Sequence, residues 1–201
     1  RSISHRGMVH GVGINDADYE IYQTINGKGL TCHFYRTWES MLKRCYSKKY
    51  KLLSKTYDGC FVCSDWLIFS NFKSWMEKQD WLDKCLDKDL LVYGNKEYHP
   101  DKCMFVDQRV NKLLTGHDAM RGQYAIGVSF HKTKMKFSAS CHNGTGKLNH
   151  LGSFKTEYEA ANAYRKFKRN VILGVANEQK EIIKQALIRI VTAHYEELSD
   201  E

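Results

Sequence analysis

Residues 124–164 read YAIGVSFHKTKMKFSASCHNGTGKLNHLGSFKTEYEAANAY and decide the fold of the C-terminal half of the chain. Two runs, 124–131 and 135–142, alternate apolar with polar residues, and a third run follows at 148–154 after a turn rich in Asn and Gly. Alternation with a period of two is typical of strands that bury one face. We therefore expect three neighbouring strands here.

The residues after the third run carry the signals of a helix start. Thr156 is followed three residues later by Glu159, which is the spacing of a capping box. Small and aromatic side chains then recur along one side of the expected helix: Ala160, Ala161, Ala163, Tyr164 and Phe167. Three strands and one amphipathic helix form a minimal two-layer module.

This module is strongly basic. Segment 121–172 contains only two acidic residues, Glu157 and Glu159. Its basic residues are Arg121, Lys132, Lys134, Lys136, Lys147, Lys155, Arg165, Lys166, Lys168 and Arg169. A small sheet with a basic outer face suits contact with DNA phosphates. The whole chain, with a formal net charge of +8, also favours a polyanionic partner.

A known family shares these features. The residues that carry the likeness are Gly127-Val128, Lys136-Phe137, His150-Leu151-Gly152-Ser153-Phe154, Thr156 and Ala160-Ala161-Asn162-Ala163-Tyr164. They resemble the AP2 DNA-binding domain, whose pattern is G-V…K-[FW]-x-A…x-L-G-x-F-x-T-x-x-x-A-A-x-A-Y. The resemblance covers about fifty residues, and it implies a three-stranded sheet that lies in the major groove of double-stranded DNA.

Alternation assigns the two faces of the expected sheet. Phe137, Ala139 and Cys141 should point toward the helix. The residues expected on the outer, DNA-facing side are Ser129, His131, Lys132, Lys134, Lys136, Ser138, Ser140, His142, Asn149 and His150. AP2 domains of the plant type carry several Arg and Trp residues on this face, so arginine readout of guanine should be weaker here. Contacts from Ser, His and Asn, or DNA shape, would then supply specificity.

A second resemblance covers the middle of the chain. The residues involved are Trp38-x-x-Met41-x-x-Arg44-Cys45-Tyr46, Val62-Cys63-x-x-Trp66, Leu86-Asp87-Lys88-Asp89, Gly94-Asn95, Tyr98-x-Pro100-x-x-Cys103-x-Phe105-Val106 and Asn111. This order resembles phage and prophage proteins of the HNH, or ββα-metal, endonucleases. Several phage homing endonucleases of that type carry an AP2 module behind the nuclease motif. The two resemblances therefore support each other and imply a bacteriophage or mobile-element origin.

The nuclease motif is altered where its chemistry is most demanding. The family uses a strand His as general base, a loop Asn that orients it, and a helix His or Asn that helps to bind one divalent ion. Lys88 stands at the position of the strand His, and Lys102 at that of the loop Asn. A lysine amine is ordinarily protonated near neutral pH and is a poor general base. The candidate catalytic residues are Asp87, Lys88, Asp89, His99 and Asn111, and Asp87, Asp89 and Asn111 are the candidate Mg²⁺ ligands.

Two functions from different classes follow. The first is a DNA-binding protein derived from a homing endonuclease that represses or blocks a DNA transaction with little or no cleavage. The alternative is a metal-dependent nickase or endonuclease with an altered HNH site. The absence of an Asp-His pair at 87–88 favours the first. Basic residues in the N-terminal half, Lys43 and Arg44 among them, could add DNA contacts.

We expect an α+β fold with four parts. These are an N-terminal arm (1–30), a degenerate HNH-like domain (31–116), an AP2-like domain (120–173) and a C-terminal amphipathic helix (174–201). Helical spacing predicts further helices at 34–46, 66–78 and 107–115. Strands are expected near 18–25 and 86–93. The C-terminal helix could pack on the domains or pair two copies in a homodimer.

The cysteines and the hydropathy indicate the cellular compartment in which the chain is expected to fold. Seven scattered cysteines, an odd number, suit the reducing cytoplasm of a bacterial host better than a disulfide scaffold. Cys60 and Cys63 form a lone C-x-x-C, and a zinc site would need further ligands such as Cys45 and Cys103. Small buried side chains are the favoured interpretation. No apolar run reaches the roughly 18–20 residues that span a bilayer, so we expect no membrane partner.

Overall fold

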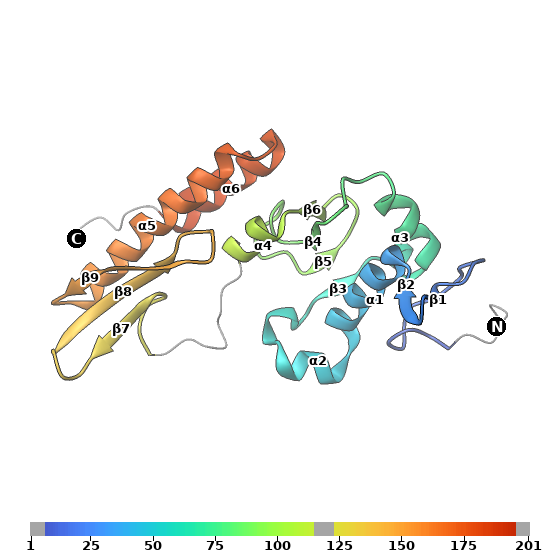
Figure 1. The fold of residues 1–201 in the computed structure, drawn as a ribbon, viewed down its shortest axis with the longest axis horizontal. Helices are drawn as coiled ribbons and strands as arrows, with labels where there is room; N and C mark the ends of the chain where they lie inside the picture. Colours follow the sequence, from blue (N-terminus) through green and yellow to red (C-terminus); the bar gives the residue numbers. More distant parts are fainter. Residues whose placement is uncertain (1–6, 115–122, 196–201) are drawn as a thin grey trace. The chain divides into compact units, whose positions relative to one another are not determined.

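The computed structural model describes residues 7–114 and 123–195, which form an α+β structure. The chain divides into two compact units, Arg1–Val106 (unit 1) and Asp107–Glu201 (unit 2). Figure 1 shows the elements of both units along the chain. The expected domain boundary at residue 116 lies outside the described residues. The helix before it belongs to unit 2, not to the N-terminal domain.

Unit 1 mixes short helices with two-residue to four-residue strands. Its elements are β1 (Tyr22–Ile25), β2 (Lys28–Thr31), α1 (His33–Tyr46), α2 (Lys48–Leu53), η2 (Lys55–Tyr57), β3 (Phe61–Val62), η3 (Ser64–Leu67), α3 (Phe69–Met76), β4 (Cys85–Asp87), β5 (Glu97–Tyr98) and β6 (Met104–Val106). The pairs β1–β2 and β4–β6 are antiparallel, and β3–β5 is parallel. The core combines side chains of the helices with Val62, Leu86, Tyr98 and Phe105 from the short strands.

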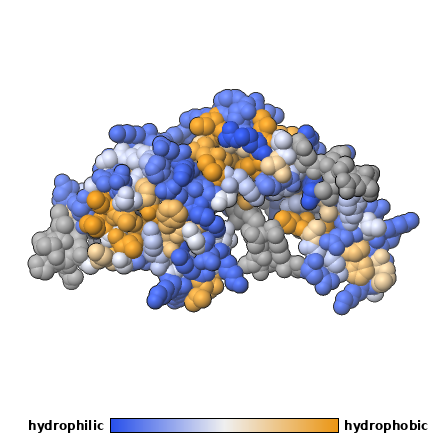
Figure 2. Space-filling model, turned by 180° about the vertical axis from the view of Figure 1, so that it is seen from behind, coloured by the Kyte–Doolittle hydropathy of each residue, from blue (hydrophilic) through white to orange (hydrophobic). Residues whose placement is uncertain are grey.

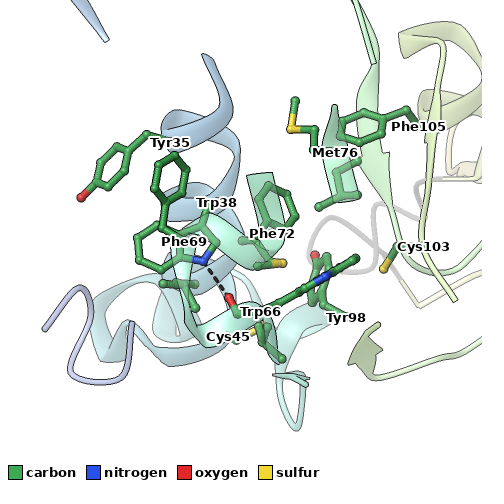
Figure 3. Close-up of a cluster of buried hydrophobic side chains, with 14 of the residues drawn as sticks. Tyr35, Trp38, Cys45, Trp66, Phe69, Phe72, Met76, Tyr98, Cys103 and Phe105 are labelled. Carbon is green, nitrogen blue, oxygen red and sulfur yellow. Dashed lines mark hydrogen bonds between the residues drawn. The ribbon is translucent and has the colours of Figure 1, made fainter. Parts of the chain in front are cut away.

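An aromatic cluster fills the centre of unit 1. Trp38 of α1 is fully buried, and its indole Nε1 donates a hydrogen bond of 2.7 Å to the carbonyl oxygen of Trp66 (Figure 3). Phe69 and Phe72 of α3 are also fully buried beside these rings. Trp38, Phe69 and Phe72 thus form the buried faces of helices at the two segments, 34–46 and 66–78, where the spacing predicted helices. Trp66, however, lies in η3, because α3 begins only at Phe69.

The expected strand at 86–93 is much shorter in the structure. β4 ends at Asp87, whose carboxylate oxygen Oδ1 accepts hydrogen bonds from the N–H groups of Asp89 (2.9 Å) and Leu90 (2.7 Å). An Asp that caps its own following backbone in this way turns the chain. The apolar residues after it therefore lie in a loop, and Leu90 is buried there.

Unit 2 contains the expected module. Its elements are α4 (Gln108–Leu114), β7 (Val128–His131), β8 (Lys136–His142), β9 (Leu148–Phe154), α5 (Glu157–Asn177) and α6 (Glu181–His194). The strands form one antiparallel sheet in the order β7-β8-β9, and α5 packs on it. The capping box is present: Thr156 accepts from the Glu159 N–H, and the Glu159 carboxylate accepts from the Thr156 N–H.

A close approach at Gly127 fixes the sheet against α5. Gly127 has a φ of 75°, and a Cβ at this position would lie 2.1 Å from a ring carbon of Tyr164. Only glycine combines that backbone conformation with the absence of a side chain. The G-V pair in the sequence therefore marks the contact between the start of β7 and the helix.

The C-terminal helix packs within its own unit. Ile183, Leu187 and Ile190 of α6 are buried, and α6 lies against α5, whose Ile172 and Val175 are buried as well. This is the first of the two expected alternatives, and it uses the apolar face on which a homodimer would depend. α5 continues to Asn177, beyond the expected end of the domain at 173. Its last turns pack against α6. Among the described residues, no helix is both long and apolar enough to cross a bilayer.

Candidate nucleic-acid interface

The sheet of unit 2 packs one face on α5, and no helix of the described residues covers the other face. Ala139 and Cys141 of β8 are buried on the helix side, as the alternation predicted. Lys136 and His142 alternate with them and are exposed on the outer side. On the neighbouring strand β7, Ser129 and His131 are exposed as well and pair with Ser138 and Lys136. The outer side therefore presents hydroxyl, imidazole and ammonium groups.

The centre of the outer side holds a linked pair. The Ser138 hydroxyl lies 3.3 Å from Nδ1 of His150, within hydrogen-bond distance. Ser138 is buried, with 5% of its surface exposed, whereas His150 is exposed. Ser138 was expected to contact DNA, but its burial leaves it the role of orienting the His150 ring. His150 and the half-buried Ser140 are the groups that remain available at this position.

The placement of Asn149 on the outer side is wrong. The register of β8 and β9 shifts between Ala139 and Ser140, so that β9 has one extra residue. Strict alternation from Ser153, which pairs with Ser138, would bring Asn149 outward. The bulge reverses the alternation, and Asn149 pairs with the buried Cys141 on the helix side. Gly152, a glycine inside a strand pattern, was the sequence signal for this bulge.

Three lysines surround the β7–β8 turn. Lys132, Lys134 and Lys136 are all exposed, and the turn is closed by a hydrogen bond of 3.2 Å from the Lys134 N–H to the His131 carbonyl oxygen. The ion pairs found in residues 7–114 and 123–195 do not include these lysines. Residues 124–156 also contain no Asp or Glu. The positive charge of this edge is therefore not compensated along the strands.

The two acidic residues of the module, Glu157 and Glu159, accept hydrogen bonds from backbone N–H groups. Glu157 accepts a hydrogen bond of 2.7 Å from the Ala125 N–H, and Glu159 completes the capping box. Hydrogen bonding from the Thr156 N–H holds the pKa of Glu159 below its ordinary value.

Not every basic residue of the module faces outward. Lys168 lies on the helix side beside Cys141, and burial there lowers its pKa. The exposed lysines of the outer side lie at the β7–β8 turn and the start of β8.

The residues that resemble the nuclease motif around Lys88 form a hydrogen-bonded network in unit 1. Lys88 is buried, and its ammonium donates to Oδ1 of Asp89 and to the carbonyl oxygen of Asn95, both at 2.6 Å. The Asn95 amide donates to the carbonyl oxygens of Lys88 (2.9 Å) and Glu97 (2.6 Å). Together with the turn at Asp87, these bonds close the loop between β4 and β5. The Lys88 side chain is thus occupied inside the fold.

The remaining candidate catalytic residues lie on other elements. The His99 ring nitrogen Nδ1 accepts a hydrogen bond of 3.2 Å from the Asp101 N–H, in a turn after β5. Asn111 lies on α4, which is part of unit 2, so the five candidates do not share one compact unit. Burial raises the pKa of the Asp87 carboxyl, against the lowering effect of the hydrogen bond from Leu90. Within the described ranges, no group of three or more His, Cys, Asp or Glu is placed to hold a metal ion.

The two basic candidates of unit 1 differ in availability. Lys43 is exposed, and its Nζ lies 5.8 Å from the centre of the Tyr50 ring. Arg44 is half-buried, with its guanidinium carbon 5.6 Å from the centre of the Tyr57 ring and a hydrogen bond to Tyr98. Arg44 thus mainly holds unit 1 together. Lys43 remains a candidate for phosphate contact.

The cysteines are free thiols in the structure. Cys45 lies near Cys60, and Cys103 near Cys63, but these residues do not form a set of three or more placed for a metal. Burial raises the pKa of both Cys45 and Cys103 to about 12, which keeps these thiols protonated and unreactive. They behave as small core side chains.

Comparisons of the chain with protein-family models, with curated proteins and with solved structures each find no match. Function is therefore inferred from the residues of this chain.

Proposed function

We propose that unit 2 binds double-stranded DNA through the outer side of the β7-β8-β9 sheet. The protein would act as a repressor or blocker of a DNA transaction, with little or no cleavage. The observation that carries this proposal is the combination of an acid-free sheet, residues 124–156, with exposed lysines at its turn. A polyanion supplies the negative charge that the sheet lacks.

The outer side offers two kinds of contact. Lys132, Lys134 and Lys136 would neutralise phosphates and set the position of the sheet, without reading sequence. Ser140, His142 and His150 would reach base edges, because hydroxyl and imidazole groups can donate or accept hydrogen bonds there. The resemblance to AP2 domains supports this geometry, since a three-stranded antiparallel sheet on one helix is the arrangement that it implies.

The proposal of weak or absent cleavage follows from unit 1. By the resemblance, Lys88 stands where the nuclease motif places its general base, and its ammonium is bonded inside the fold. A buried ion-paired ammonium cannot take a proton from water. The alternative of an active nickase would need a different base, and His99 is the candidate for it.

A gel shift and a nicking assay test the proposal together. In EDTA, the full chain should retard labelled duplexes, and it should leave supercoiled plasmid intact in Mg²⁺ or Mn²⁺. Replacing Ser140 and His142 by Ala should reduce discrimination between duplex sequences, by on the order of tenfold for each base that the side chain no longer reads. Failure to retard any duplex would refute DNA binding. Robust nicking that Asp89→Ala abolishes, with binding intact, would instead establish the enzyme.

A further inference from the structure

Unit 1 exposes a pair of leucines that its own fold does not use. On the face drawn in Figure 2, apolar side chains form separate patches among hydrophilic ones. Among the large apolar side chains of the described residues, Leu52 and Leu53 are the most exposed, at 83% and 75%. They end helix α2, none of whose residues is buried. Burial of two adjacent leucines is worth several kcal/mol, so such exposure needs an explanation.

The leucines sit in a purely basic stretch. Between Ser40 and Tyr57 the chain contains no Asp or Glu. The basic residues of this stretch are Lys43, Arg44, Lys48, Lys49, Lys51 and Lys55. Those of α2 and η2 flank the leucines on both sides in sequence, and none takes part in the ion pairs seen among the described residues. Charge complementarity therefore points to a polyanion rather than to a neutral apolar partner.

Contacts between its own residues define the conformation of this segment. The Ser47 hydroxyl accepts a hydrogen bond of 3.3 Å from the Tyr50 N–H at the start of α2, and the Ser54 N–H donates to the Tyr50 carbonyl oxygen at its end. The rings of Tyr50 and Tyr57 pack with their centres 5.8 Å apart. The leucine pair thus lies at the end of a short helix, α2, that has hydrogen bonds at both ends. A rigid apolar tip costs less ordering entropy when it inserts into a partner.

We infer that Leu52 and Leu53 form a wedge that inserts between base steps of duplex DNA, while the flanking lysines contact phosphates. Proteins that bind the minor groove use apolar side chains in this way, and the unstacked step kinks the duplex by roughly 20–90°. This inference rests on the proposed function, because it takes the polyanion to be DNA. It assigns to unit 1 the deformation of the DNA that unit 2 binds.

The test uses the full chain and a duplex of about 30 base pairs with a fluorophore pair on its ends, which reports bending by energy transfer. The unmutated chain should bind and raise the transfer. The variant Leu52→Ser with Leu53→Ser should abolish the rise and weaken binding by on the order of tenfold. The matched control is Leu82→Ser, since Leu82 is 67% exposed but stands between Asp80 and Asp83. It should behave like the unmutated chain.

The outcomes distinguish a failure of the leucine wedge from a failure of DNA binding by the sheet. Unchanged affinity and unchanged transfer in the leucine variant would overturn the wedge and leave the sheet as the DNA-binding surface. Absence of DNA binding by the unmutated chain would overturn both. A parallel assay uses vesicles of phosphatidylserine and phosphatidylcholine. Vesicle binding that the leucine variant loses, while its DNA bending stays intact, would assign the leucines to a membrane and overturn the wedge.

Discussion

The two units of this chain use lysine in opposite ways. Lys88 of unit 1 is buried, and its ammonium is bonded to Asp89 and Asn95. Lys132, Lys134 and Lys136 of unit 2 are exposed on a sheet whose strands carry no acidic residue. The Lys88 ammonium donates to two oxygens inside the fold, whereas a group of exposed ammoniums outside the ion pairs attracts an anion. The comparison favours the sheet, rather than the loop around Lys88, as the surface proposed to bind DNA.

The units also differ in their cores. All four tryptophans, Trp38, Trp66, Trp75 and Trp81, belong to unit 1, where the aromatic cluster supplies the packing. Unit 2 has none and relies on α5 against the sheet and on α6 against α5. Tryptophan fluorescence therefore reports the folding of unit 1 alone. This allows mutations in the two units to be compared in the same molecule.

The largest expected effect comes from the core of unit 1. Trp38→Ala should lower the free energy of unfolding of unit 1 by about 3–5 kcal/mol, because it leaves a large cavity and removes the bond to Trp66. Fluorescence of the remaining tryptophans measures this loss. Sheet binding to DNA should persist at temperatures where that fluorescence shows unit 1 unfolded. Simultaneous loss of both signals would show that the units fold as one.

The corresponding destabilising substitution in unit 2 is Gly127→Ala. The new methyl would meet Tyr164 and would occupy a φ of 75°, so unit 2 should lose about 2–4 kcal/mol of stability. Far-UV circular dichroism and DNA affinity should both report the loss, and the tryptophan transition should not move. Gly146→Ala is the control, since its φ is 96° but nothing lies within 4 Å of the added Cβ. Its cost should be smaller, about 1–2 kcal/mol.

A smaller effect distinguishes the two kinds of lysine. Lys88→Met should destabilise unit 1 by about 1–3 kcal/mol, because the Asn95 carbonyl oxygen loses a buried donor. DNA affinity should stay within experimental error. Denaturant titration by fluorescence and a binding isotherm on the same preparation measure the two quantities. A fall in affinity with stability unchanged would place Lys88 at the DNA and reverse the comparison.

The smallest effect concerns Asp87. Burial raises the pKa of its carboxyl, so folded unit 1 holds this proton more tightly than the unfolded chain does. Stability is then lost as pH rises from the ordinary value of about 3.9 through the folded pKa. Asp87→Asn cannot titrate, so its stability relative to the unmutated protein should increase across that window. The exposed Asp101→Asn is the control, and a profile for Asp87→Asn parallel to that of the unmutated protein would contradict the assignment.

Local signals predicted the helices and strands best. The capping box at Thr156 and Glu159 and the periodic core positions of α1 are present as expected, since these features depend on neighbours in sequence. The bulge that turns Asn149 inward and the turn that ends β4 at Asp87 were missed. Both depend on hydrogen bonds that break a regular pattern. Periodicity alone does not report such breaks.

The candidate site was predictable in type but not in detail. The absence of acidic residues from 124–156 indicated a basic surface in advance. The burial of Ser138 beneath His150 and of Lys88 beside Asp89 required the fold. These partners come from pairings between strands or across a loop. A single sequence does not specify which polar groups will meet.

The most direct test of DNA binding by the sheet is the salt dependence of affinity for the unmutated chain and for a variant with Lys132, Lys134 and Lys136 replaced by Ala. The unmutated chain should lose affinity with salt at a log–log slope of roughly −4 to −7, and the variant slope should be smaller in magnitude by about 3. Replacement of the exposed Lys28 and Lys78 of unit 1 is the control and should leave the slope unchanged. A flat salt dependence, or a variant slope equal to that of the unmutated chain, would contradict the proposal that the sheet binds DNA.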